Sequence, residues 1–256
     1  MIVLFTDFGL EGPYIGQMTA AVLKEAPNAQ VVNLMSDAPA FDPNAAAYLL
    51  ASLVSSFPER TVFLCVVDPG VGSQRKPLVI EADNRFFVGP DNGLLAVAAK
   101  RARHAVAQEI VWEPEELSET FHGRDLFAPV AAKIATGRAV ETREMDVSGI
   151  VGWNWPKESE KAVYIDGYGN IVTGVRAENL SKESTVEIDG KRIEWALRFS
   201  SVQKSRCFWY ENSNGLVEVA AREDSAAKLL GLGVGDKIKI IGSKAKAGDK
   251  GRAKSG

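Results

Sequence analysis

The chain has 256 residues, of which 46% are hydrophobic and 25% are charged, as in ordinary folded proteins. This composition excludes a disordered, collagen-like or disulfide-scaffold protein, and a chain of this length can bury the core of one large domain or two small ones. The formal net charge of −3 excludes nucleic-acid binding driven by overall charge, so no nucleic-acid partner is expected.

Short apolar segments alternate with helical patterns through the first half of the chain. The segment 61–67 is apolar on both faces, as in a strand whose sheet is covered on both sides. Strands that alternate with helices indicate an α/β fold with a doubly wound sheet. Strands are expected at 2–6, 31–35, 61–67, 78–82 and 85–88, with a hairpin at Asp83-Asn84, and helices are expected after Pro13, from Asp42-Pro43, from Gly93 and from about His122 to Thr136.

The pattern changes near Trp153-Asn154-Trp155-Pro156, so we expect a domain boundary between Gly152 and Glu160. Beyond it, short strand-like segments are separated by glycine-containing turns, which is typical of a small β-sandwich or barrel. The expected domains are 1–152 (α/β), 161–241 (β-barrel) and 242–256, a basic tail whose composition favours disorder. The expected strands here are 162–166, 171–175, 185–188, 191–195 and 236–241, with hairpin signals at Asp189-Gly190 and Asn214-Gly215.

The cysteines and the hydropathy of the chain indicate the cellular compartment in which we expect the protein. Cys65 and Cys207 form no CxxC pair, which favours two buried free thiols in a reducing compartment. No apolar run approaches the length of a membrane span, and the first residues lack the features of a signal peptide. The expected location is therefore the cytoplasm, with no membrane partner.

Three motifs lie where expected strands end, the place where open α/β sheets bind ligands. Asp7 follows the first strand, and its carboxylate is suited either to a vicinal diol or to capping a turn. Asp68 follows the third strand, and Arg75 can fold back onto it, as a structural or a functional ion pair. His122 opens a helix, where it can act as a general base, as a donor to an anion or as a cap.

Several other site classes are not supported. The two histidines lie far apart in sequence and there is no CxxC pair, so no metal site is expected. The segment 70–73 lacks the spacing of a phosphate-binding loop, and no Gly-x-Ser-x-Gly elbow is present. Pro90-Asp91-Asn92-Gly93 is interpreted as a structural turn before a helix.

Taken together and in order, the motifs resemble the SAM hydroxide adenosyltransferases. These are S-adenosylmethionine hydrolases formerly called domain of unknown function 62, related to the fluorinase and chlorinase. The matching segments are Thr6-Asp7-Phe8-Gly9, Val67-Asp68-Pro69-Gly70-Val71-Gly72 with Arg75, Pro90-Asp91-Asn92-Gly93-Leu94, Phe121-His122-Gly123-Arg124-Asp125, Asp166-x-x-Gly169-Asn170 and Ser213-Asn214-Gly215.

The resemblance implies hydrolysis of S-adenosylmethionine, as the (R)-sulfonium epimer, to adenosine and methionine without a cofactor. It also implies a homotrimer with active sites at the subunit interfaces. Asp68, Arg75 and His122 match the family's catalytic triad, which prepares water for attack on C5′. The implied substrate contacts are Asp7 to the ribose diol, Phe41 as an aromatic lining, Asp166 to the methionine ammonium, Asn170 to adenine, Ser213 to the methionine end, and the backbone of Glu218 and Val219 to the adenine edge.

Two other functions stay open at this point. A halide-using relative would make 5′-halo-adenosine, but the halogenases have other residues where this chain has the triad. A non-catalytic protein that binds adenosine or S-adenosylmethionine is the alternative of a different class. The chain also departs from the family at one place: relatives often carry an acid where this chain has Gly12, and here the acid is next door at Glu11.

Overall fold

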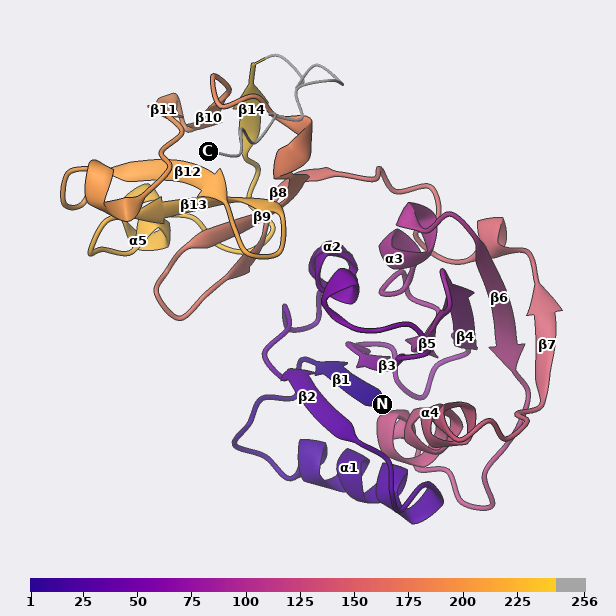
Figure 1. The fold of residues 1–256 in the computed structure, drawn as a ribbon. Helices are drawn as coiled ribbons and strands as arrows, with labels where there is room; N and C mark the ends of the chain where they lie inside the picture. The colour runs from indigo at the N-terminus through magenta and orange to yellow at the C-terminus, as the bar shows by residue number, and fades with distance from the viewer. Residues whose placement is uncertain (243–256) are drawn as a thin grey trace, which may run out of the picture. The chain divides into compact units, whose positions relative to one another are not determined.

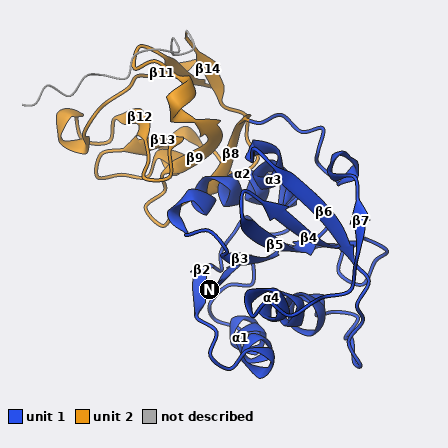
Figure 2. Ribbon diagram, turned by 45° about the vertical axis from the view of Figure 1, so that its right-hand side comes forward, with its two compact units in different colours: residues 1–157 blue, residues 158–256 orange. Residues whose placement is uncertain are grey.

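The structure is a computed structural model that describes residues 1–242. It contains two compact units, Met1–Lys157 and Glu158–Gly256, the second described as far as residue 242 (Figure 2). The basic tail expected at 242–256 lies, apart from Gly242, outside the described residues.

The first unit is built on a seven-stranded sheet of order β2-β1-β3-β5-β4-β6-β7. Strands β1, β2, β3 and β5 are parallel, whereas β4, β6 and β7 run antiparallel to their neighbours. The mixed sheet is therefore parallel only over its first four positions. The bounds are β1 Ile2–Thr6, β2 Val31–Met35, β3 Val62–Val66, β4 Pro77–Ala82, β5 Arg85–Pro90, β6 Ala105–Ile110 and β7 Thr142–Met145.

Helices cover both faces of this sheet (Figure 1). Helices α1 (Tyr14–Glu25) and α4 (Ala128–Ala135) pack together on one face, and α2 (Pro43–Leu53) and α3 (Ala96–Arg101) pack together on the other. The side chains of Met18 and Val22 are fully buried on α1, as their helical spacing predicts. The Asp42 side chain caps α2 by accepting the amide of Ala45 at 2.9 Å, so this predicted N-cap is confirmed.

The strand order changes direction beside β1, the kind of place where open α/β sheets bind ligands. The chain leaves β1 toward β2 on one side, while β3 lies on the other side, which makes this a switch point of the topology. Strands β1 and β3 pair in parallel with Thr6 opposite Val66. The residues that follow, Asp7 and Asp68, therefore emerge at the same edge of the sheet.

Some predicted elements differ from the structure. The hairpin at Asp83-Asn84 is present, and both of its turn residues have positive φ, but strands β6 and β7 were not predicted. The single helix expected from about His122 is divided into a π-helical turn, Gly123–Phe127, and α4. Pro129 has no amide to donate to the carbonyl of Asp125, which favours the wider turn.

The described part of the second unit contains two sheets. One has four strands in the order β12-β13-β9-β8 and the other three in the order β11-β10-β14. Isolated bridges pair Lys161 with Lys237 and Trp195 with Trp209 in addition to the strand pairs, and continuous pairing does not close the described strands into a barrel. The bounds are β8 Ser159–Ile165, β9 Ile171–Arg176, β10 Thr185–Ile188, β11 Lys191–Ile193, β12 Cys207–Glu211, β13 Leu216–Ala221, α5 Ala226–Leu230 and β14 Lys239–Ile241.

Two remaining findings concern the thiols and the helices. Cys65 and Cys207 are both free, as expected, but Cys207 is only partly buried, so the expectation of two buried thiols is wrong for this residue. It lies at the first position of β12, where the strand begins.

No helix within residues 1–242 combines the length and apolar character needed to cross a bilayer.

Candidate active site

The centre of the site in the first unit is an ion pair that closes the loop after β3. Arg75 Nε donates to both carboxylate oxygens of Asp68, at 3.0 and 2.8 Å, and Nη2 donates to Oδ2 at 2.5 Å. Only 9% of the Arg75 side chain and 4% of the Asp68 side chain are exposed. Such a forked, buried arrangement holds both groups in one orientation. Among the described residues Oδ1 accepts a single hydrogen bond, so a lone pair remains available for water.

His122 completes this cluster through the same nitrogen of Arg75 that binds Asp68. Nη2 of Arg75 lies 3.0 Å from Nδ1 of His122. Because a guanidinium only donates, this contact requires a lone pair on Nδ1 and leaves the proton of the neutral ring on Nε2. Burial, and then the charge of Arg75, lower the pKa of His122 below its ordinary value of 6.5. The imidazole is therefore neutral at neutral pH and presents an Nε2–H donor.

Packing holds the guanidinium of Arg75 in place. Its carbon lies 5.3 Å from the centre of the Phe127 ring, and Phe127 itself is fully buried in the core between the sheet and α4. The cation therefore rests on an aromatic face that belongs to the rigid part of the unit.

The loop of Asp68 and the segment of His122 are in close backbone contact. Gly72 has φ +79°, and a Cβ at this position would lie 2.7 Å from the carbonyl oxygen of Glu119. Only glycine permits both this conformation and this approach. The His122 segment is further held by Asp125, whose Oδ2 accepts the amide of Ser118 at 3.0 Å. Arg124 and Asp125 form an ion pair within this segment, with Nε 2.5 Å from Oδ1.

Asp7 holds a neighbouring loop by its carboxylate. Its Oδ2 accepts the amide of Phe41 at 3.1 Å, and Phe41 has φ +59° with 78% of its surface exposed. Burial raises the pKa of Asp7, the Phe41 amide lowers it, and the negative charge of Asp68 raises it further. The electrostatic effect of Asp68 agrees with the positions of the two carboxylates at adjacent strand ends.

An aromatic cluster joins the segment after β1 to the segment of His122. The rings of Phe8, Tyr14 and Phe121 lie pairwise at 5.6 to 5.8 Å, and Phe121 immediately precedes His122. This cluster ties the segment that follows Asp7 to the histidine. Glu11 and Gly12, where the sequence departs from the family that it resembles, are exposed.

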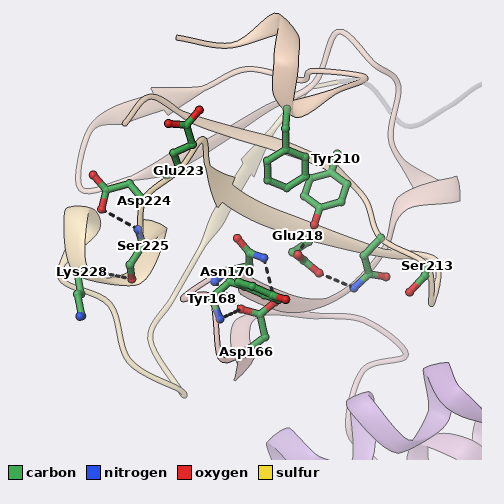
Figure 3. Close-up of a pocket in the computed structure, with 13 residues that line it drawn as sticks. Asp166, Tyr168, Asn170, Tyr210, Ser213, Glu218, Glu223, Asp224, Ser225 and Lys228 are labelled. Carbon is green, nitrogen blue, oxygen red and sulfur yellow. Dashed lines mark hydrogen bonds between the residues drawn. The ribbon is translucent and has the colours of Figure 1, made fainter. Parts of the chain in front are cut away.

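A second group of predicted residues lines a pocket of about 910 Å³ in the second unit (Figure 3). Asp166 Oδ1 accepts the amides of Tyr168 and Asn170, both at 2.9 Å, and its Oδ2 accepts the Asn170 side-chain amide at 2.9 Å. The Asp166 carboxylate therefore fixes the side chain of Asn170 within a tight turn. Gly169 in this turn packs so closely on Ser225 that a Cβ would lie 2.0 Å from its Oγ.

Glu218 brings a buried carboxylate to the same pocket. It is 6% exposed, accepts the hydroxyl of Tyr210, and accepts Nδ2 of Asn212 at 2.9 Å. Burial, and then the hydrogen bond to Glu218, raise the pKa of Tyr210, so the phenol stays protonated as the donor. Ser213 also lines the pocket, whereas the side chain of Val219 lies in the core of the unit.

Tyr210 and Asn212 are pocket residues that sequence reasoning missed. The signal was present, because the predicted hairpin at Asn214-Gly215 pairs Tyr210 directly with Glu218 across its two strands. Counting outward from the turn identifies this cross-strand pair.

The predicted residues thus form two groups, one in each unit. Asp7, Phe41, Asp68, Arg75 and His122 lie on the first, and Asp166, Asn170, Ser213, Glu218 and Val219 on the second. Arg75 and His122 also border a smaller cavity of about 490 Å³ whose apolar lining includes Trp112 and Leu117. Within residues 1–242, no three His, Cys, Asp or Glu side chains are grouped in a way that would hold a metal ion.

Comparisons with known proteins match nearly the whole chain. Residues 2–144 match the SAM hydroxide adenosyltransferase N-terminal domain, and residues 160–239 match the C-terminal domain of the same family. An (R)-S-adenosyl-L-methionine hydrolase from Thermus thermophilus is 34% identical over 94% of this chain and 99% of the relative. One from Methanocaldococcus jannaschii is 30% identical over 94% and 95%. The crystal structure of an uncharacterized conserved protein from Thermotoga maritima is 30% identical and superposes with a TM-score of 0.84, covering 94% of this chain and 100% of that one.

Proposed function

The chain belongs to the SAM hydroxide adenosyltransferase family, and we propose that it hydrolyses (R)-S-adenosyl-L-methionine to adenosine and L-methionine. Relatives named for this activity are 30% and 34% identical over most of the chain. The observation that carries the proposal is the buried ion pair of Asp68 and Arg75 beyond the carboxyl end of β3, with the partly buried His122 in contact with Arg75.

The chemistry requires an activated water but no acid for the leaving group. The water oxygen bonds to C5′ as the C5′–S bond breaks, and sulfur keeps the electron pair and leaves as a neutral thioether. One proton is released from the water. Asp68 is the residue that accepts it, because its Oδ1 has a lone pair available at the site. General-base assistance of this kind contributes about 10²–10⁴-fold to a rate.

Arg75 and His122 serve this step by orientation and charge. Arg75 holds the Asp68 carboxylate by a fork of hydrogen bonds and stabilises the negative charge that develops on the water oxygen. The Nε2–H of His122 donates to the same water, since its Nδ1 is engaged by Arg75. The histidine is therefore a donor in this mechanism and does not take the proton.

Substrate binding is assigned to both groups of residues. Asp7 accepts the two hydroxyls of the ribose, and Phe41 lines the site beside it. In the second unit, Asn170 and the backbone at Glu218 and Val219 hold the adenine. Asp166 attracts the methionine ammonium, and Ser213 contacts the same end of the substrate.

The assembly and location are part of this proposal. We infer a homotrimer in which the two groups of residues that serve one substrate come from neighbouring subunits, and a second unit that forms a β-barrel. The bridges Lys161–Lys237 and Trp195–Trp209 support the barrel, and the free thiols support a cytoplasmic location. A solution mass of about three times 27.6 kDa supports the trimer, and a mass of one chain contradicts it.

The test of function is incubation of chelator-treated protein with each sulfonium epimer and chromatography for adenosine and methionine. Equal amounts of both products from the (R) epimer, without dependence on halide, are expected. A 5′-halo-adenosine formed with added halide would identify a halide-using synthase. Tight adenosine binding without products from either epimer would identify a non-catalytic binding protein.

A further inference from the structure

The turn at Asp91 and Asn92 binds both ends of the loop 68–75, which carries Asp68 and Arg75. Nδ2 of Asn92 donates to the carbonyl of Val67 at 2.8 Å, the residue immediately before Asp68. The amide of Asp91 donates to the carbonyl of Lys76 at 2.8 Å, the residue immediately after Arg75. Two successive residues of one turn therefore bind the peptide groups at which the segment 68–75 begins and ends.

The turn itself is braced from its other side. Asp91 Oδ1 accepts the amide of Val151 at 2.8 Å. Gly93 has φ +97°, and a Cβ there would lie 2.2 Å from the Trp155 ring. Lys100 binds the carbonyl of Trp155 at 2.6 Å. The turn is therefore held between the loop 68–75 and the segment 151–155.

We propose that Asn92 is a positioning residue for the proposed hydrolysis, acting through the Val67 carbonyl to set the place of the Asp68 carboxylate. The inference rests on the proposed function. The other polar atom of Asn92, Oδ1, accepts the amide of Leu94 at 3.2 Å, so the side chain bridges two backbone groups. Asp68 is also locked to Arg75, and Arg75 to His122, so a shift of Val67 moves the whole cluster relative to bound substrate.

The test compares Asn92→Ala with a matched control, Thr61→Val. Thr61 immediately precedes β3, at the end of the strand opposite to Asp68. Its buried side chain donates a hydrogen bond from the hydroxyl to the carbonyl of Pro58 at 2.8 Å. Each variant removes one side-chain bond to a backbone carbonyl. Because a displacement of about 1 Å costs roughly 10²-fold in rate, kcat of Asn92→Ala is expected to fall about 10- to 100-fold with KM within about threefold. Thr61→Val is expected to keep its kcat within about twofold.

A second, nearly isosteric variant, Asn92→Asp, keeps the test valid if Asn92→Ala fails to fold. Asn92→Asp keeps the acceptor for Leu94 but replaces the donor to Val67 with an oxygen, so it is expected to lower kcat at least as much as Asn92→Ala. The proposal is overturned if both Asn92 variants retain the kcat of Thr61→Val, or if they raise KM at constant kcat.

Hydrogen–deuterium exchange separates this proposal from the proposed function. Faster exchange of amides 68–76 in Asn92→Ala than in Thr61→Val is expected, whatever reaction the protein catalyses. If the wild type fails to hydrolyse either epimer, the proposed function fails while the exchange measurement still tests the holding of the loop. Equal exchange in the two variants overturns the positioning role.

Discussion

The two groups of site residues are built in opposite ways. In the first unit, Asp68 and Arg75 are only seven residues apart, but two other contacts join residues distant in sequence: Arg75 with His122 and Asp7 with Phe41, which are 47 and 34 residues apart. In the pocket of the second unit the contacts are local: Asn170 binds Asp166 four residues away and Asn212 binds Glu218 six residues away. The first arrangement depends on the whole sheet, whereas the second depends on single turns.

This difference matches the proposed work of each group. A water and a carbon must be aligned within narrow limits, so the reacting groups are fixed by a buried ion pair on a rigid sheet. Recognition of a nucleoside needs only correctly oriented polar groups around a cavity. Tight turns can supply such groups. Substitutions in the cluster of Asp68, Arg75 and His122 are therefore expected to lower kcat, and those in the pocket of the second unit to raise KM.

The largest expected effect follows from Asp68→Ala. Removal of the proposed proton acceptor is expected to lower kcat roughly 10³-fold, within the range for general bases, while adenosine still binds. Single-turnover assays and calorimetry measure the two quantities. The control is Glu158→Gln, which disrupts another Arg–carboxylate pair, with Arg176, without touching the cluster. Full activity of Asp68→Ala would remove this residue from the mechanism.

Arg75→Lys tests whether charge alone suffices in the first group. Lysine keeps the positive charge but lacks the fork that reaches both Asp68 and His122. A fall in kcat of about 10²-fold is expected, because the carboxylate loses its fixed orientation. A variant with wild-type kcat would show that the geometry of the fork is dispensable.

Asp166→Ala tests the second group. The Asn170 side chain loses its partner, so KM for S-adenosylmethionine is expected to rise about tenfold, with a smaller change in kcat. Steady-state kinetics separate the two constants. Asp236→Ala is a matched control, since its carboxylate also accepts a turn amide, from Gly233 at 2.7 Å, but it does not line the pocket. A loss confined to kcat contradicts the assignment of this group to binding.

The smallest effect concerns pH. Because the pKa of His122 is lowered below 6.5, its protonation is expected only at more acidic pH, where it breaks the contact with Arg75 and lowers kcat. The unfolded chain binds this proton more readily, so the contribution of His122 to stability is also lost as the pH falls from 6.5 through the lower folded value. In a pH–rate profile, His122→Gln is expected to lack this acid limb. An unchanged limb in the variant assigns it to another group.

Much of the local structure was predictable from the sequence. The cap at Asp42, the hairpin at Asp83-Asn84 and the fully buried β3 follow from rules that act over a few residues. The pairing of Asp68 with Arg75, left open between a structural and a functional role, spans only seven residues and is present. Strand β6 was missed because its buried and exposed positions do not alternate cleanly, and β7 was missed because none of its four positions is buried.

What the sequence by itself determined is the family and most of the elements, and it supplied the proposal for the reacting groups, because these depend on residue types and short spacings. Only the tertiary structure decided that His122 meets Arg75 through Nδ1 and therefore presents Nε2–H, that the backbone at Gly72 lies against Glu119, and that the turn at Asn92 holds the loop of Asp68. The physical reason is that such contacts join distant segments whose approach is set by sheet topology and core packing, which no short pattern encodes.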